Sequence, residues 1–264
     1  MSGDWLAVCR AAAEDVRGVL RELPTRTERE PVVGDGVGGD ETTAVDAAAE
    51  RVILERLRAI DGATIVSEEV GEVPGDGPLR IVVDPIDGSL NAKRGIPFFS
   101  LSVAVAEGET MDDVLFGYVH DFGTGEEWTA ERGRGARLDG VELGPLRPKE
   151  RIEILSFEAT LTSSVAEKAA AMVGIAYRLR IMGSLALSLC HLAAGRVDAV
   201  CSLKAARAVD IAAAQLLVRE RGLAIELPEA APFGQAPLDT EGRSRVVAAA
   251  SPDVCSELFA ALSR

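Results

Sequence analysis

The sequence predicts a mixed α+β and α/β protein with two lobes. In the first half, amphipathic segments precede closely spaced strands, which favours helices packed over a mostly antiparallel sheet. In the second half, strands and helices alternate, as they do in an α/β layer. Between the halves, the stretch GPLRPKER at residues 144–151 is rich in Pro, Gly and charge. We therefore expect one lobe over residues 1–147 and a second over 148–264.

The first half is expected to open with two helices and continue as strands. Apolar residues recur at helical spacing over 5–20, and the segment AVDAAAERVILERLRAI at 44–60 is amphipathic in the same way. The polar, Gly-rich segment 24–41 between them predicts a mobile loop. Apolar runs then predict strands at 63–66, 79–83, 99–106, 114–120 and 127–130.

The second half is expected to alternate regularly after the junction. Its predicted strands are at 152–157, 177–181, 199–201 and 245–250. Its predicted helices are at 163–172, 184–194, 211–221 and 252–262. No internal repeat accompanies this pattern.

Composition excludes several classes of function. The 264 residues include 28 basic and 42 acidic ones, a net charge of −14. Nucleic acids and anionic membranes need a basic surface, so neither is expected as a partner. The four cysteines form no Cys-x-x-Cys pair, and His120 and His191 lie far apart, which argues against a zinc centre. Acidic residues near the N-terminus argue against a signal peptide, and no run of 18 apolar residues is present, so we expect a cytoplasmic protein.

The segment LRIVVDPIDGSLN at 79–91 is the most informative one for function. An apolar strand runs into Asp84, and the Asp-Pro and Asp-Gly pairs then predict a sharp turn that also holds Asp87. Two carboxylates at ~4 Å in a partly screened site repel each other by ~4 kcal/mol. A divalent cation with oxygen ligands is the simplest way to relieve this repulsion. An ordinary surface turn of Asp, Pro and Gly is the alternative.

Four further acids, Asp46, Glu68, Glu69 and Asp210, attract attention by their placement. All but Glu69 are expected where a strand ends or a helix begins, which is where sheet-based folds assemble ligand sites. Each also has a purely structural interpretation. Asp46 completes a capping box with Thr43, the two glutamates form an exposed acidic loop, and Asp210 caps a helix.

Five segments together resemble the inositol monophosphatase family. They occur in the family's order and span residues 41–222. The run GSLNAKRGIPFFSLSVAV resembles the archaeal-type branch, which includes dual inositol phosphate and fructose bisphosphate phosphatases. The five segments are ETTAVDAAAE at 41–50, VSEE at 66–69, LRIVVDPIDGSLN at 79–91, IMGSLALSLCHLAAGRVDAV at 181–200 and AVDIAAAQLLVRERG at 208–222.

The resemblance implies a layered α-β-α-β-α sugar-phosphatase fold with the site between the lobes. It implies Mg²⁺-dependent hydrolysis of a small phosphate monoester, inositol-1-phosphate or fructose-1,6-bisphosphate, by metal-activated water. It also implies two or three Mg²⁺ per site and a homodimer. Carboxylates that carry a charge of about −5 would be balanced by these ions, so that the site accepts a phosphate dianion.

The resemblance also assigns the metal ligands. Asp84 would bridge two Mg²⁺ ions. Glu68 and the carbonyl group of Ile86 would complete the first site, and Asp87 and Asp210 the second.

The catalytic water and the phosphate are assigned in the same way. Asp46 and Glu68 would lie near a weaker third ion, and either would orient the nucleophilic water together with Ser89. The backbone N–H groups of Gly88 and Ser89, at a helix start, would hold phosphate oxygens.

The expected substrate contacts extend to the second half of the chain. Gly183 and Ser184 begin a helix and would face the alcohol side of the substrate, with a tight turn as the alternative for Gly183. Arg180 meets a phosphate or sugar, or lies exposed at a strand end. Lys204 and Arg207 hold a second phosphate or the sugar ring, or lie on a solvated loop. The full expected set is Asp87, Gly88, Ser89, Arg180, Gly183, Ser184, Lys204, Arg207 and Asp210.

Two departures from the family pattern bear on metal binding and on substrate preference. The loop VGDGVGGDETT lacks the family's Lys, which puts third-ion recruitment in doubt. Leu203 stands where animal inositol enzymes place a Glu that contacts inositol hydroxyls, which counts against copying their substrate preference.

Two other functions compete with this interpretation. The stretch Gly34–Gly39 matches the GxGxxG pattern of a dinucleotide-binding oxidoreductase, but that site needs a buried strand directly before it, and RTEREPVV is charged and broken by Pro. A non-enzymatic family member is the second alternative. Retention of all five predicted acids argues against it.

Overall fold

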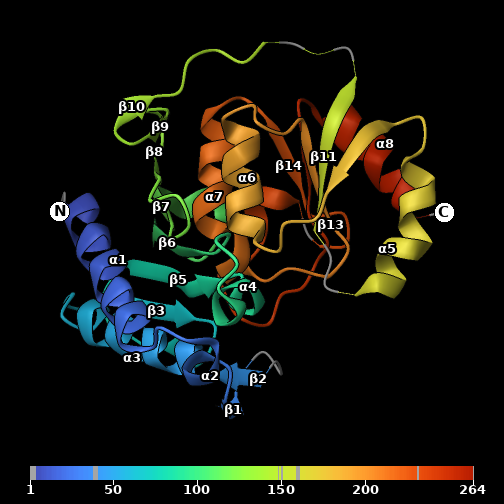
Figure 1. The fold of residues 1–264 in the computed structure, drawn as a ribbon. Coiled ribbons are helices and arrows are strands. Elements are labelled where there is room, and N and C mark those ends of the chain that lie inside the picture. Colours follow the sequence, from blue (N-terminus) through green and yellow to red (C-terminus); the bar gives the residue numbers. More distant parts are fainter. Residues whose placement is uncertain are drawn as a thin grey trace.

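The computed structural model describes residues 4–37, 41–147, 149, 151–158, 161–230 and 232–263. Its helices and two main sheets stack in five layers, in the order α-β-α-β-α (Figure 1). This is the layered fold that the sequence predicts. No helix in the described part of the chain is long and apolar enough to cross a membrane.

An eight-stranded sheet forms the second layer. Its strand order is β10-β9-β8-β7-β6-β5-β3-β4, and every pair is antiparallel except β3 with β5. Because β3 and β5 run in parallel, their carboxyl ends meet at one edge. The strands are β3 (Thr64–Ser67), β4 (Gly71–Val73), β5 (Leu79–Asp87), β6 (Ser100–Glu107), β7 (Val114–Asp121), β8 (Glu127–Glu131), β9 (Ala136–Leu138) and β10 (Val141–Glu142).

Helices cover both faces of this sheet. On the outer face α1 (Trp5–Glu22) packs on α3 (Ala44–Leu57), and both contact the sheet. On the inner face α6 (Leu185–Ala193) and α7 (Ala208–Glu220) form the middle layer (Figure 1). Helix α7 approaches β7 so closely that a Cβ on Gly117 would lie 2.4 Å from the carbonyl oxygen of Ala213. Only glycine allows this contact.

A five-stranded sheet forms the fourth layer, in the order β12-β11-β13-β15-β14. Strand β11 is parallel to β12 and β13, whereas β15 is antiparallel to its two neighbours. Helix α8 (Pro252–Leu262) covers its outer face. The strands are β11 (Ile152–Glu158), β12 (Ala176–Arg180), β13 (Ala199–Ser202), β14 (Ala224–Glu226) and β15 (Val247–Ala249).

Short elements complete the described chain. An antiparallel hairpin pairs β1 (Val32–Asp35) with β2 (Glu41–Thr43). These elements are α2 (Arg26–Arg29), β1 (Val32–Asp35), β2 (Glu41–Thr43), α4 (Ser89–Arg94), α5 (Thr162–Ala169) and the 3₁₀ turns Met111–Asp113, Ala170–Met172 and Phe233–Gln235.

The predicted loop over 24–41 is wrong in part, because α2 and the β1–β2 hairpin occupy much of it. All residues of β1 are exposed, so no apolar alternation marks it in the sequence. Strands β4, β9, β10 and β14 are also absent from the predicted set; each has only two or three residues. The lobe boundary between residues 147 and 148 stays a prediction.

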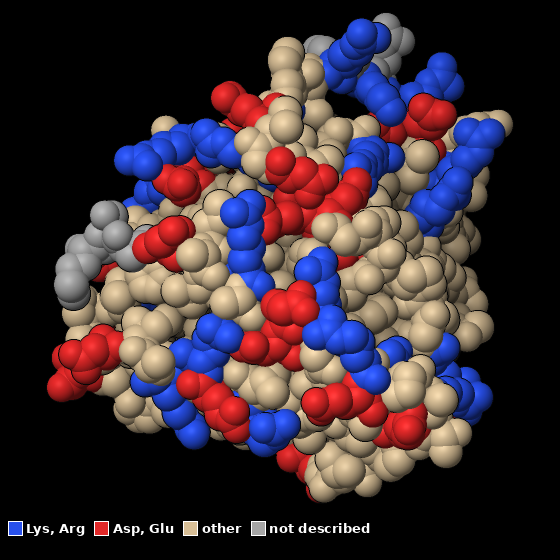
Figure 2. Space-filling model, turned by 60° about the vertical axis from the view of Figure 1, so that its left-hand side comes forward, with Lys and Arg blue, Asp and Glu red and all other residues tan. Residues whose placement is uncertain are grey.

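Surface charge is mixed on the face shown in Figure 2. Lysine and arginine side chains lie among aspartate and glutamate ones there, and no continuous basic surface covers the described residues of that face. This agrees with the net charge of −14, which disfavours a polyanionic partner.

Candidate active site

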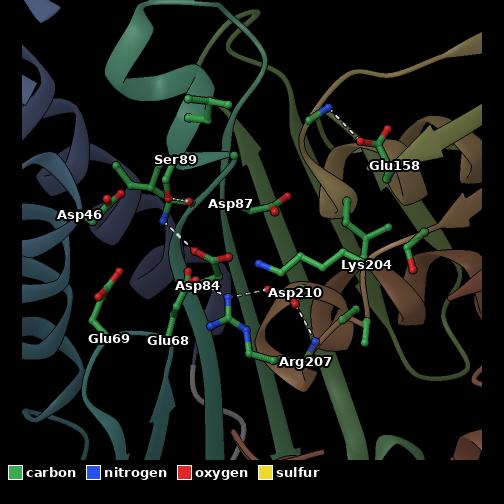
Figure 3. Close-up of a pocket in the computed structure, with 18 of the residues that line it drawn as sticks. Asp46, Glu68, Glu69, Asp84, Asp87, Ser89, Glu158, Lys204, Arg207 and Asp210 are labelled. Atoms are coloured by element: carbon green, nitrogen blue, oxygen red, sulfur yellow. Dashed lines mark hydrogen bonds and ion pairs between the residues drawn. The ribbon is translucent and has the colours of Figure 1, made fainter. Parts of the chain in front are cut away.

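A pocket of about 560 Å³ lies where the carboxyl ends of β3 and β5 face the loops that precede α6 and α7 (Figure 3). Both halves of the chain contribute to it. Its lining consists of Glu41, Asp46, Glu68, Glu69, Asp84, Ile86, Asp87, Gly88, Ser89, Leu90, Lys93, Glu158, Gly183, Leu185, Ser202, Lys204, Ala205, Ala206, Arg207 and Asp210.

The DPIDG turn at the end of β5 forms the floor of the pocket. The backbone N–H of Ile86 donates to Asp84 Oδ1 at 2.9 Å, and the Ser89 hydroxyl donates to the Ile86 carbonyl oxygen at 3.0 Å. Gly88 follows with φ +96°, and a Cβ there would lie 3.0 Å from the carbonyl oxygen of Gly183. The turn therefore needs glycine both for its backbone angle and for its close approach to the second half of the chain.

Asp87 connects this turn to the start of α6. Its Oδ2 accepts hydrogen bonds from the Ser184 hydroxyl and from the backbone N–H of Ala186, the latter at 2.8 Å. Ser184 is buried behind Asp87 and does not line the pocket itself. The structure therefore gives its predicted substrate contact no support, and its hydroxyl orients Asp87 instead.

Asp46 enters the pocket from the first turn of α3. Its Oδ2 accepts from the Thr43 backbone N–H at 3.1 Å and from the Thr43 hydroxyl at 2.5 Å, which is the predicted capping box. Its Oδ1 is buried and has no hydrogen-bond partner among the described residues. A buried carboxylate oxygen without a partner is costly, which indicates that a bound group completes its environment.

Arg207 lies between two acids that the sequence assigns to the metal site. Its Nη2 donates to Glu68 Oε1 and lies 3.3 Å from Asp210 Oδ1. Asp210 Oδ2 also accepts from the Arg207 backbone N–H at 2.6 Å at the start of α7. The Arg207 side chain is only 10% exposed, so it is held against these acids.

Glu68, Asp84, Asp87 and Asp210, here called the acidic cluster, strongly affect one another. Burial, and then repulsion from Glu68 and the other acids, raises the pKa of Asp84 well above its ordinary value. Burial raises the pKa of Glu68 to about 7, although Arg207 lowers it. Burial also raises the pKa of Asp87 to about 7, against the hydrogen bond from Ser184. The cluster therefore lacks positive charge even with Arg207 in place.

The donor set fits a hard divalent cation such as Mg²⁺, which prefers carboxylate and carbonyl oxygens. As the side chains stand, no three Cys, His, Asp or Glu residues within the described ranges are close enough together to hold an ion. The guanidinium group of Arg207 lies against two of the acids, Glu68 and Asp210. The unpartnered oxygen of Asp46 and the raised pKa values of Glu68, Asp84 and Asp87 both indicate a need for positive charge.

The structure brings most of the predicted residues together. The pocket lining includes Asp46, Glu68, Asp84, Ile86, Asp87, Gly88, Ser89, Gly183, Lys204, Arg207 and Asp210. Arg180 is different. It lies exposed at the end of β12, donates to the carbonyl oxygen of Leu179 and does not line the pocket, so the structure gives its predicted substrate contact no support.

Several pocket residues were missed by reasoning from sequence. The most buried of the charged ones is Glu158, which is 6% exposed. It ends β11, a strand parallel to its neighbours, so the rule that ligand sites form at the carboxyl ends of parallel strands could have found it. Glu41 and Lys93 also line the pocket, but no sequence pattern identifies either of them as a pocket residue.

The dinucleotide-binding alternative does not fit the structure. Gly34 lies in β1, which is exposed and pairs antiparallel with β2, instead of following a buried strand. Gly38 and Gly39 lie outside the described residues.

Comparison with known proteins decides the family. The model of the inositol monophosphatase family matches residues 5–264. The chain belongs to the inositol monophosphatase family. This membership places it among the phosphoric monoester hydrolases, in a family that is generally metal-dependent and acts on small phosphorylated substrates.

Individual relatives of this inositol monophosphatase family member point to the archaeal branch. A fructose-1,6-bisphosphatase/inositol-1-monophosphatase of Archaeoglobus fulgidus is 33% identical over 249 residues, 93% of each chain. One of the same description from Thermococcus kodakarensis is 33% identical over 223 residues, 84% of this chain and 83% of the relative. A crystal structure described as an inositol monophosphatase-fructose 1,6-bisphosphatase has 26% identity and a TM-score of 0.86, covering 98% of this chain and all of that one.

Proposed function

We propose that the pocket hydrolyses a small phosphate monoester with Mg²⁺, and that inositol-1-phosphate or fructose-1,6-bisphosphate is its substrate. One observation carries the proposal. Several buried carboxylates line one pocket, and the positive side chains there do not balance their negative charge. Divalent cations bind in such an environment, and the bound cations then allow an anionic ester to bind. The archaeal relatives with both names support the substrate class.

The chain's own groups would hold two or three Mg²⁺ ions. Asp84, Glu68, the Ile86 carbonyl, Asp87 and Asp210 would hold them. When bound, the ions would supply charge stabilisation and would lower the pKa of water near the ester.

Asp46 and Ser89 would orient the attacking water. The capping box fixes Asp46 by one oxygen and leaves Oδ1 unpartnered among the described residues. The Ser89 hydroxyl, which donates to the Ile86 carbonyl, keeps its lone pairs for a water proton. Glu68 is the second candidate for the acceptor of that proton, once it is no longer paired with Arg207.

The phosphate and the alcohol would occupy different ends of the pocket. Gly88 and Ser89 line it beside Asp87, and their backbone N–H groups would bind phosphate oxygens there. Gly183, Lys204 and Arg207 line it from the second half of the chain, towards the alcohol side.

The predicted homodimer and the cytoplasmic location stay predictions. Light scattering after size exclusion would test whether the protein is a homodimer.

A phosphate-release screen tests the proposed function. Inositol-1-phosphate, fructose-1,6-bisphosphate, histidinol phosphate and adenosine 3′,5′-bisphosphate would each be incubated with the protein, with Mg²⁺ or with EDTA. We expect release from one or both of the first two, only with Mg²⁺. Release that persists in EDTA, or no release from any of the four, would contradict the proposal.

A further inference from the structure

We propose that Glu158 is a specificity-determining residue that accepts hydrogen bonds from hydroxyl groups on the alcohol part of the substrate. The inference rests on the proposed function, because it assigns a role at the same site. Glu158 belongs to none of the segments that resemble the family, and its carboxylate is not in the acidic cluster.

The position of Glu158 places it at the far side of the pocket. It is the last residue of β11 and pairs in register with Ser202, the last residue of β13, and both line the pocket. Figure 3 shows Glu158 across the pocket from Asp46 and Ser89, with Asp87 between them. An ester whose phosphate lies near Ser89 and Asp87 would therefore extend its alcohol part towards Glu158.

One turn connects Glu158 to Asp87. Glu158 Oε2 accepts from the backbone N–H of Gly183 at 2.8 Å, and Asp87 Oδ2 accepts from Ser184 and Ala186 in the next three residues. The two carboxylates thus bracket the start of α6. This geometry fixes Glu158 relative to Asp87 while leaving it outside the acidic cluster.

The hydrogen-bond partners of Glu158 hold it firmly without neutralising it. Its Oε1 accepts from the hydroxyls of Ser156 at 2.8 Å and Ser188 at 2.7 Å, and from the Met182 N–H at 3.5 Å. Together with the Gly183 N–H, these donors are all uncharged. A carboxylate has about four acceptor positions, and Oε2 uses only one of its two on these partners.

The remaining acceptor position determines what Glu158 can bind. A buried carboxylate repels a phosphate, so it disfavours the anionic end of a substrate there. It favours a neutral O–H donor, because hydrogen bonds to an ionised acceptor are stronger than those between neutral groups. A polyol or sugar supplies several such hydroxyls. Glu158 would therefore select esters whose alcohol part carries hydroxyl groups near the phosphate.

Glu158→Gln separates this role from a structural one. The Gln carbonyl oxygen still accepts from the Gly183 N–H, and its amide donates to the hydroxyls of Ser156 and Ser188, which can act as acceptors. The framework is thus kept while the negative charge is lost. Glu153→Gln is the matched control, because Glu153 is an exposed glutamate of the same strand that does not line the pocket.

The experiment compares inositol 1-phosphate with cyclohexyl phosphate, which has the same ring without the other hydroxyls. For the wild type and both variants, kcat/KM would be measured with Mg²⁺, and affinity by calorimetry with Ca²⁺, which takes the same oxygen ligands in looser geometry. We expect Glu158→Gln to lose about 10-fold on inositol 1-phosphate in both measurements and less than about 2-fold on cyclohexyl phosphate. Glu153→Gln should change neither.

Equal losses on both esters would overturn the inference, because they would show that Glu158 acts only by positioning the Gly183 turn. No loss on either ester would overturn it as well. Failure of the proposed function has a different signature, namely a wild type that releases phosphate from no ester with Mg²⁺. The Ca²⁺ titration still decides the inference in that case, and a wild type that binds neither ester would also refute it.

Discussion

The two sides of the pocket carry buried carboxylates in opposite surroundings. Where β3 and β5 end, burial and then repulsion from neighbouring acids raise the pKa values of Glu68, Asp84 and Asp87, and Arg207 compensates only in part. Where β11 ends, Glu158 lies among uncharged hydroxyl and N–H donors. A crowded cluster calls for added cations, whereas a single buried carboxylate with a spare acceptor position calls for a neutral donor. The pocket is therefore built to bind a charged group at one side and a hydroxyl-bearing group at the other.

Removing one charge from the acidic cluster should have the largest effect. Asp87→Asn and Asp210→Asn should each lower Mg²⁺-dependent turnover by about 1,000-fold or more, because a metal ligand is lost at the reacting centre. Both variants should stay folded, since Asn can still accept the hydrogen bonds that Ala186 and Arg207 donate. Circular dichroism and phosphate release would be measured together. Full Mg²⁺-dependent activity in either variant would contradict the claim that the acidic cluster, unlike the Glu158 side of the pocket, binds the metal.

Glu50 is a further buried acid, one helical turn behind Asp46 on α3. It lies on α3, 4% exposed, and the Ser67 hydroxyl donates to its Oε2 at 2.7 Å. Burial raises the pKa of Glu50 to about 7, with a smaller contribution from Glu69. The folded protein therefore keeps a proton that the unfolded chain releases near pH 4.5. Its stabilising contribution is present below that pH and is lost as the pH rises through about 7.

Glu50→Gln should remove this pH dependence, because an amide does not ionise. We expect the variant to gain ~2–3 kcal/mol more relative to the wild type at pH 8 than at pH 5. Urea unfolding at the two pH values measures the difference, with Glu153→Gln as an exposed control. An equal change at both pH values would show that Glu50 is ionised throughout. The raised pKa of Glu50 would then be contradicted.

Arg207 bears on the acidic cluster from the other half of the chain. Its guanidinium group and a divalent cation compete for Glu68 and Asp210, so Arg207→Ala should tighten Mg²⁺ binding by about 10-fold. Calorimetric titration would measure this. Arg219→Ala is the control, because Arg219 lies on the same helix but pairs with Asp112 away from the pocket. Unchanged or weaker Mg²⁺ binding in Arg207→Ala would mean that Arg207 does not compete with the ion.

Lys204 should have the smallest effect and the most selective one. It lines the pocket on the loop between β13 and α7, where a second phosphate of a bisphosphate would lie. Lys204→Ala should lower kcat/KM for fructose-1,6-bisphosphate about 5-fold more than for inositol-1-phosphate, because only the first substrate has a second anionic group. Equal losses on both substrates would remove this role.

The two sides of the pocket also differ in how well the sequence predicts them. Asp84 and Asp87 share one local turn, and Glu68 follows a strand parallel to β5, so short segments were enough to assign them. Glu158 becomes a pocket residue only through the pairing of β11 with β13, more than forty residues away in sequence. Arg180 lies on an edge strand, and no local sequence pattern indicates whether its side chain points towards the pocket or away from it. The sequence also gives no sign that Leu203 packs against the core beneath α8.

Direct Mg²⁺ titration of the wild type and Asp84→Asn tests the central claim most closely. Asp84 is at the centre of the acidic cluster, and every other member raises its pKa. We predict that calorimetry shows at least two Mg²⁺ ions on the wild type and that Asp84→Asn loses high-affinity binding of both, with its fold intact. If Asp84→Asn binds Mg²⁺ as the wild type does, the acidic cluster is not the metal site and the proposed chemistry fails.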